Sequence, residues 1–176
     1  MDATGSRNEL YQKVAGDYGS ALDRLAHAYE ADPDRRRDLL QEIHLALWRS
    51  FESFGGRCSL RTWIYRVAHN VATSYVVRQR RRTVPTFLTL EEAEGESDHE
   101  SAEVSVNSKQ LLARLLALIQ RLEPVDRQIM LAYLEGMDAE SIAEITGLSV
   151  TNVWTKTHRI KNLLARRFHA GGSDGR

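Results

Sequence analysis

The stretch Ser53–Arg82 reads SFGGRCSLRTWIYRVAHNVATSYVVRQRRR and carries the strongest chemical signal in the chain. It contains seven arginines and one histidine but no aspartate or glutamate, although 27% of the whole chain is charged. One tryptophan and two tyrosines are interspersed among the arginines. Basic side chains next to aromatic ones are typical of a surface that holds a polyanion and stacks its bases. A solvated basic helix is the plainer interpretation, and the lack of acids disfavours it.

Apolar side chains recur every three or four positions from about Leu60 to Arg82, which predicts a helix over that range. The predicted core stripe consists of Leu60, Ile64, Val67, Val71 and Tyr75. The other faces carry polar side chains that suit phosphates and base edges. These side chains are Arg66, His69, Asn70, Thr73 and Ser74.

Two more helices are predicted on the amino-terminal side, at about residues 8–31 and 33–53. Asp32 would cap the second helix, and Pro33 fits its first position. Its buried stripe is predicted to be Leu40, Ile43, Leu47, Phe51 and Phe54. The residues off that stripe are Leu39, Gln41, Glu42 and Arg49. Leu39 beside Gln41 and Glu42 is therefore expected on an exposed face suited to docking or, alternatively, on ordinary partly buried surface.

An acidic segment follows, because residues 83–107 contain seven acids and neither lysine nor arginine. The segment has little apolar periodicity, which predicts a flexible linker. Beyond it, periodicity and capping residues predict four helices, which begin near Ser108, Pro124, Asp138 and Ser149. The predicted fold is therefore all-α, with two small helical domains, residues 8–82 and 108–169, joined by the flexible acidic linker.

Residues 139–158 have the spacing of a helix-turn-helix. Ala143 permits close approach of the second helix, Gly147 suits a left-handed turn, and Val153 packs the second helix back. That helix would lie in the major groove of DNA with its first residues at base edges. The residues expected at the DNA are the cap Ser149 and Thr151, Asn152, Thr155, Lys156, His158 and Arg159. An ordinary helical hairpin is the alternative, and the lack of acids from residue 149 to residue 170 favours DNA.

Two residues depart from the usual pattern of this motif. Trp154 is bulky for a helix that faces a groove, which favours packing against a neighbouring helix. Thr157 stands where a leucine is expected. Both departures concern the helix that would read the DNA.

Composition narrows the remaining classes of protein. The chain has 176 residues, a length sufficient for one medium domain or two small ones. Its formal net charge is +0. Its single cysteine, Cys58, excludes an internal disulfide and a cysteine-based metal site. No apolar run approaches the roughly 18 residues of a membrane span, and the N-terminus lacks a signal-peptide core. We expect a cytoplasmic protein without membrane insertion.

Catalytic chemistry is not expected. The sequence shows no nucleophile–base pair, no phosphate-binding glycine loop and no cluster of metal ligands. We therefore predict a protein that is not an enzyme, with no catalytic residue, no cofactor and no metal site.

Two series of short motifs lie on either side of the acidic segment. The first is DLLQE at residues 38–42, then Trp48, Phe54 and TWIYRVAHN at residues 62–70. The second comprises LEP at 122–124, Arg127, Tyr133, EG at 135–136, IA at 142–143, GLSV at 147–150, Val153 and HR at 158–159. In this order, the two series resemble the sigma factors of bacterial RNA polymerase, specifically the small two-domain extracytoplasmic-function (ECF) group of the sigma-70 family.

The resemblance implies a role for each half. Residues 8–82 would be region 2, which binds the polymerase clamp and the −10 promoter element, and residues 108–169 would be region 4, which reads the −35 element. The implied clamp contacts are Asp38, Leu39, Gln41 and Glu42. A loop of residues 54–59 would hold a base flipped out of the −10 element. The implied −10 contacts are Phe54, Arg57, Ser59, Arg61, Trp63, Arg66, Asn70 and Arg78.

The resemblance also implies partners. These are core RNA polymerase and promoter DNA, with an anti-sigma factor as a further candidate. The acidic linker is expected to compete for the basic helix and so to suppress DNA binding by the free protein.

Two alternatives remain open at this point. A helix-turn-helix transcriptional activator of the response-regulator type would share the second half, but it requires an α/β domain in the first half. An anti-sigma-like adaptor would act through protein contacts and would not need two basic faces.

Overall fold

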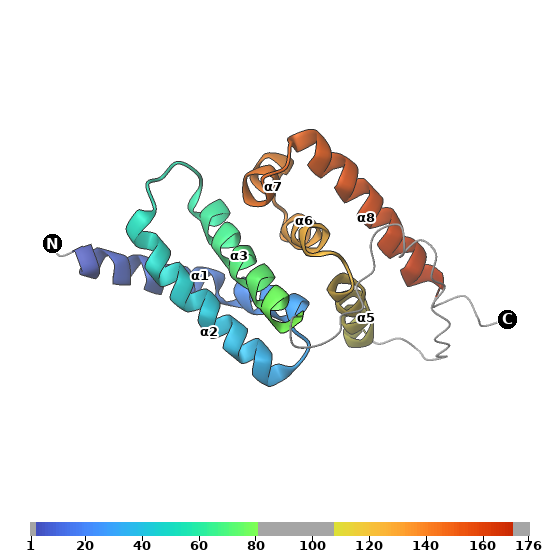
Figure 1. Ribbon diagram of the computed structural model, residues 1–176, viewed down its shortest axis with the longest axis horizontal. Coiled ribbons are helices and arrows are strands. Elements are labelled where there is room, and N and C mark those ends of the chain that lie inside the picture. The colour runs from blue at the N-terminus through green and yellow to red at the C-terminus, as the bar shows by residue number, and fades with distance from the viewer. Residues whose placement is uncertain (1–2, 81–107, 171–176) are drawn as a thin grey trace.

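The computed structural model describes residues 3–80 and 108–170, and both parts of the chain are helical. Figure 1 shows the first part at the left and the second part at the right. No strand occurs within these two parts, which confirms the predicted all-α fold. The α/β domain that a response-regulator activator requires is therefore absent from residues 3–80. The predicted linker, residues 83–107, lies outside the described residues.

The first part consists of α1 (Ala3–Tyr29), α2 (Pro33–Ser50), a short 3-10 helix η1 (Phe51–Ser53) and α3 (Leu60–Arg80). Asp32 caps α2 as predicted, because its carboxylate accepts hydrogen bonds from the amides of Asp34 at 3.1 Å and Arg35 at 2.9 Å. A carboxylate at this position also complements the positive end of the helix dipole. The cap fixes the bend after α1, and α2 packs against both α1 and α3.

The second part consists of α5 (Ser108–Gln120), α6 (Pro124–Leu134), α7 (Ala139–Thr146) and α8 (Val150–Ala170). Asp138 caps α7 by accepting a hydrogen bond from the Ser141 amide at 2.8 Å. Gly147 ends α7 with a φ of 75°, a conformation that side chains with a Cβ disfavour. The chain therefore turns sharply between α7 and α8, as the spacing predicts.

The two parts pack against each other, chiefly α3 against α7 and α1 against α5. Glu135, directly after α6, accepts two hydrogen bonds of 2.9 Å from the Arg24 guanidinium and one of 3.0 Å from the Tyr65 hydroxyl. The Gln120 side chain donates to the His27 carbonyl oxygen at 2.8 Å. Buried apolar side chains of both parts belong to one core cluster, so the contact between the halves is both apolar and polar.

Leu39 and His69 differ from their predictions. Leu39 is 0% exposed, so the predicted exposed position is wrong. It shares the buried side of α2 with Ile43 and Leu47, four and eight positions further on, which is the spacing of one helix face. His69 was expected on a DNA-facing surface and is also 0% exposed. Its Nδ1 lies 3.0 Å from the Tyr29 hydroxyl of α1, inside the bundle.

The described residues provide neither a membrane-spanning helix nor a cluster of metal ligands. None of the helices there is both long and apolar enough to cross a bilayer. The same residues contain no group of three or more histidine, cysteine, aspartate or glutamate side chains that could hold a metal ion.

Candidate nucleic-acid interface

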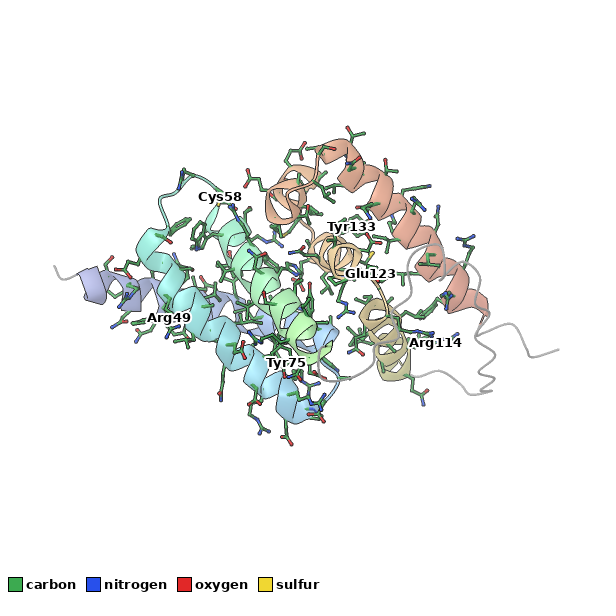
Figure 2. All side chains as sticks on the ribbon, in the orientation of Figure 1. Arg49, Cys58, Tyr75, Arg114, Glu123 and Tyr133 are labelled. Carbon is green, nitrogen blue, oxygen red and sulfur yellow. The ribbon has the colours of Figure 1, made fainter. Side chains whose placement is uncertain are left out.

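The loop between η1 and α3 is anchored at the start of α3. Ser59 Oγ accepts a hydrogen bond from the Thr62 amide at 3.0 Å and lies 2.8 Å from the Thr62 hydroxyl oxygen. Ser59 is therefore the N-cap of α3. Arg57 is exposed in this loop, and Cys58 is half-buried at the side that faces the second part (Figure 2).

Trp63 is held by three neighbours. Its indole N–H donates to Ser50 Oγ at 3.0 Å, and its ring centroid lies 5.4 Å from that of Phe54. The Arg66 guanidinium lies 5.5 Å from the indole centroid, within cation–π range. Trp63 and Phe54 are both half-buried, so they present aromatic surface whose orientation is already fixed.

Two arginines of α3 tie this region to its surroundings. Arg66 Nη2 lies 3.0 Å from Cys58 Sγ, which connects the helix to the preceding loop. Arg61 donates from Nη2 to the backbone carbonyl oxygen of Glu135 in the second part. Asn70 is exposed further along α3. Of these predicted −10 contacts, Asn70 faces solvent, whereas Arg61 is engaged by the other half.

A cleft of about 750 Å³ separates this region from the helix-turn-helix. One wall includes Arg57, Trp63 and Arg66, and the other includes Ala143, Glu144 and Leu148. Glu144 thus places a carboxylate on the wall opposite two predicted −10 contacts that are cationic. In this conformation α7 covers the side of the first part on which these contacts gather.

Glu135 is ionised in this arrangement. Burial opposes its charge, but the hydrogen bonds from Arg24 and Tyr65 outweigh burial and lower the pKa of the Glu135 carboxyl below its ordinary value. Burial, followed by the nearby Glu135 charge, raises the pKa of the Tyr65 hydroxyl, so this phenol remains a hydrogen-bond donor. Glu135 therefore binds three groups of the first part, counting Arg61 at its backbone.

The helix-turn-helix is formed by α7 and α8, whose facing side chains are buried. Ile142 on α7 is 2% exposed and Val153 on α8 is 1% exposed. Thr157, where a leucine was expected, is 7% exposed and packs on the same side. Ser149 Oγ accepts a hydrogen bond from the Asn152 amide at 3.3 Å, in keeping with its predicted role as the cap of α8.

Most of the predicted −35 contacts share the solvent side of this unit. The exposed ones are Ser149, Thr151, Asn152, Thr155, His158 and Arg159. Lys156 differs, because its Nζ lies 2.7 Å from a carboxylate oxygen of Asp126 on α6, whose side chain is 5% exposed. This ion pair attaches α8 to α6 and engages the Lys156 charge within the protein.

Trp154 is 66% exposed, so the prediction that it packs against a neighbouring helix is wrong. Each residue of an α-helix is rotated by about 100° from the one before it. Val153 and Thr157 face the core, which turns Trp154 toward solvent beside Thr151 and His158.

The exposed side of α2 carries three of the four predicted polymerase contacts, Asp38, Gln41 and Glu42. Glu42 Oε2 lies 2.6 Å from Arg78 Nη2 on α3, so one ion pair joins a predicted polymerase contact to a predicted DNA contact. Leu39 does not reach this surface. Leu45, at 48% exposed, supplies its apolar side chain instead.

Sequence reasoning missed Leu45 and the contact that Glu135 makes with the first half, since Glu135 entered it only as part of the EG motif. Leu45 follows Asp38 by seven positions and Gln41 by four, so helical spacing could have placed it on the same side of α2 as these two predicted polymerase contacts. Glu135 gives no comparable local signal, because its partner Arg24 is 111 positions away in the sequence.

Comparisons with known proteins agree on one family. The family described as "Sigma-70 region 2" matches residues 15–82, and "Sigma-70, region 4" matches residues 112–164. The chain is similar to the ECF RNA polymerase sigma-E factor of Haemophilus influenzae, with 31% identity over 138 residues, 74% of this chain and 73% of the relative. It is also similar to the ECF RNA polymerase sigma factor SigG of Mycobacterium tuberculosis, at 29% identity. That match covers 92% of this chain and 51% of the longer relative.

Two solved structures share the fold. One is CnrH in complex with the cytosolic domain of CnrY, with a TM-score of 0.67 and 19% identity over 96% of this chain and 93% of that one. The other is the sigma factor RpoE in complex with the anti-sigma factor NepR from Bartonella quintana, with a TM-score of 0.67 and 18% identity over 95% of this chain and 99% of that one.

Proposed function

This chain belongs to the ECF group of the sigma-70 family, and we infer from this membership that it binds core RNA polymerase, recognises −10 and −35 promoter elements and helps to melt promoter DNA. The observation that carries the inference is the order of the two matched regions, each of which ends in a basic helix that contains no acid. RNA synthesis belongs to the polymerase, so the chain needs no catalytic residue or cofactor of its own. The site of action is the cytoplasm, where bacterial polymerase meets DNA.

Residues 8–82 act as region 2, residues 108–169 act as region 4, and residues 83–107 connect them. Within region 2, α2 docks on the polymerase clamp through Asp38, Gln41 and Glu42. Leu45 lies on the same side and adds an apolar contact. Burying a leucine side chain contributes about 1.5–3 kcal/mol, so Leu45 is a substantial part of this contact.

The −10 element is melted at the Trp63–Phe54 pair. Flipping a base out of the duplex costs a few kcal/mol, and stacking on an aromatic side chain returns about 1–3 kcal/mol per base. Arg57 and Arg66 flank the pair and neutralise the phosphates of the separated strand, while Asn70 reaches base edges. Ser59 contributes by capping α3 and thereby holding the loop in place.

The −35 element is read by the start of α8. Asn152 and Thr151 are exposed there and carry the amide and hydroxyl groups that read base edges. Arg159 is exposed two turns further on and suits a phosphate. Lys156 attaches α8 to α6 through Asp126, which supports a positioning role for this lysine.

Promoter binding requires the two halves to move apart. The −10 contacts Arg61 and Arg66 face α7 or the segment before it, and a cleft of about 750 Å³ is far smaller than a DNA duplex. We therefore assign the described conformation to the free protein, and an opened one to the protein bound to polymerase and promoter.

An anti-sigma factor is the proposed protein partner of the closed form. A groove of about 310 Å³ between the halves is lined mostly by apolar side chains of α1, α5 and α6. Solved structures that share this fold contain such a partner or the cytosolic domain of CnrY. A partner that binds across both halves would hold them together and keep the −10 contacts covered.

Open-complex formation tests the proposed function. Core polymerase with the wild-type protein should give permanganate-reactive thymines on a promoter fragment. Trp63→Ala should still assemble with core polymerase, because α2 carries that contact, but it should reduce the reactivity strongly. Normal melting with Trp63→Ala would remove the assigned role of the Trp63–Phe54 pair.

A further inference from the structure

Trp154 is the most exposed of the large apolar side chains in the described part of the chain, at 66%. The others lie on α2, α3, α5 and α6, so Trp154 is the sole member of this group on α8 among the described residues. Single exposed apolar residues are common on protein surfaces. An indole at the start of a helix that meets DNA is different, because its surroundings in the complex are base edges and phosphates.

The position of Trp154 follows from the phase of α8. Val153 and Ile160 are 1% and 0% exposed and pack the helix onto the rest of the second half. The neighbouring position points away from that contact, on the side that also carries Thr151 and His158. Trp154 therefore shares the exposed side of α8 with two predicted base contacts.

Thr155, the next residue on α8, exposes an apolar group as well. Its hydroxyl donates to the backbone carbonyl oxygen of Thr151 at 3.0 Å, so the polar group is used within the helix. The methyl group of this exposed side chain is the part left to meet a ligand. Trp154 and the Thr155 methyl group are thus two exposed apolar groups at the start of α8, on a helix surface that is otherwise polar.

In the major groove, the thymine 5-methyl group is the apolar group among base edges that otherwise offer donors and acceptors. The thymine 5-methyl group is therefore the apolar partner on a base edge that an indole in that groove can contact. We propose that Trp154 selects thymine at one position of the bound duplex by covering its 5-methyl group. The proposal rests on the proposed function, because it requires α8 to lie in the groove.

Two other roles for Trp154 make different predictions. The indole N–H donating to a phosphate would add affinity without sequence preference. Docking of the indole on polymerase or another protein would leave duplex binding unchanged and weaken the protein complex. The polar and basic side chains around Trp154, with no acid from residue 149 to residue 170, favour the nucleic acid.

The test uses holoenzyme made from core polymerase and the full chain. Binding sites are first selected from random duplexes, and each thymine in the −35 half of the selected site is then replaced by deoxyuridine, which lacks only the methyl group. At one position the wild-type holoenzyme should bind the deoxyuridine duplex about fourfold more weakly, the factor expected for one buried methyl-sized group. Trp154→Ala should bind the thymine and deoxyuridine duplexes equally, and Trp154→Phe should keep part of the preference.

Leu112→Ala is the matched control, because Leu112 is 57% exposed on α5 and lies outside the helix-turn-helix. It should discriminate thymine from deoxyuridine as the wild type does. Three results would overturn the proposal: no thymine in the selected −35 half, equal wild-type binding with deoxyuridine at every position, or a Trp154→Ala variant that still discriminates. If the holoenzyme still binds a specific sequence, any of these three results contradicts the role of Trp154 and leaves the proposed function intact. A holoenzyme that selects no sequence contradicts both the role of Trp154 and the proposed function.

Discussion

His69 lies inside the first half with no exposed surface. Its Nδ1 pairs with the Tyr29 hydroxyl at 3.0 Å, and its Nε2 has no hydrogen-bond partner within the described residues. Burial lowers the pKa of His69 to about 3, whereas histidine in an unfolded chain titrates near 6.5. Because the unfolded chain binds a proton that the folded protein rejects, the free energy of unfolding falls as the pH drops from about 6.5 toward 3.

Replacing His69 should therefore change how stability depends on pH. In the wild type this group lowers the free energy of unfolding by up to about 1.4 kcal/mol per pH unit over that window. His69→Gln should flatten the slope, as measured by chemical denaturation at several pH values from 7 to 4. Tyr29→Phe is the control, since it removes the hydrogen bond and keeps the imidazole. It should lower stability at every pH with the slope retained. An unchanged slope in His69→Gln would contradict the account.

Arg159 and Lys156 on α8 differ in their surroundings. Arg159 is exposed, whereas Lys156 is paired with Asp126. Arg159→Ala should weaken duplex binding by the holoenzyme and reduce the slope of log K against log salt by about 0.9, the value for one lost phosphate contact. Lys156→Ala should leave that slope nearly unchanged and lower thermal stability, since it strands the buried Asp126 carboxylate. The assignment fails if the two variants exchange these effects.

At the scale of single helices, the sequence predicted what local chemistry determines. Asp32, Asp138 and Gly147 signal helix ends through contacts within a few residues, and the structure has those ends. The buried side of α2 was misjudged because Leu39 and Leu40 are adjacent, and each fits an apolar stripe with Ile43. Two stripes about 100° apart are equally consistent with the sequence. Packing against α1 and α3 selects the one that contains Leu39.

Leu39 and Leu45 on α2 should therefore respond oppositely to the same substitution. Leu39→Ala opens a cavity in the core and should destabilise the protein by about 2–5 kcal/mol. Leu45→Ala changes an exposed residue and should alter stability by less than about 0.5 kcal/mol. It should nevertheless weaken the affinity for core polymerase, as measured by competition with a labelled sigma factor. If Leu45→Ala binds core polymerase as tightly as the wild type, the docking side of α2 has been assigned wrongly.

For the molecule as a whole, the contact between halves depends on partners that are distant in the sequence. Glu135 meets Arg24 and Tyr65 across separations of 111 and 70 positions, and no periodicity or motif in a single sequence reports such pairs. The same limit applies to Arg61, whose basic character predicted a nucleic-acid contact but not its bond to the second half. The sequence therefore predicted the helices of both halves but not the contact that holds the halves together.

Weakening the Glu135 contact should open the free protein. The Glu135 pKa is lowered in the folded state, so its contribution is present above the ordinary carboxyl pKa and is lost as the pH falls through the lowered one. Glu135→Gln removes the charge at neutral pH and should expose the cleft between the halves. Cys58 lines that cleft and is the single cysteine, so its rate of reaction with a maleimide reports opening and should rise.

Glu140→Gln provides the control, because Glu140 is an exposed acid on α7. Its Cys58 reaction rate should match that of the wild type. Equal rates in the wild type and Glu135→Gln would show that the Glu135 contact does not keep the cleft closed.

The central claim, that this chain is a promoter-specific initiation factor, is tested most directly by run-off transcription on genomic fragments. Core polymerase alone should give no defined start sites. Addition of the protein should produce discrete starts, each preceded by two recurring sequence elements at a fixed spacing, one for each half of the chain. Absence of protein-dependent transcripts, or start sites without such elements, would contradict the account.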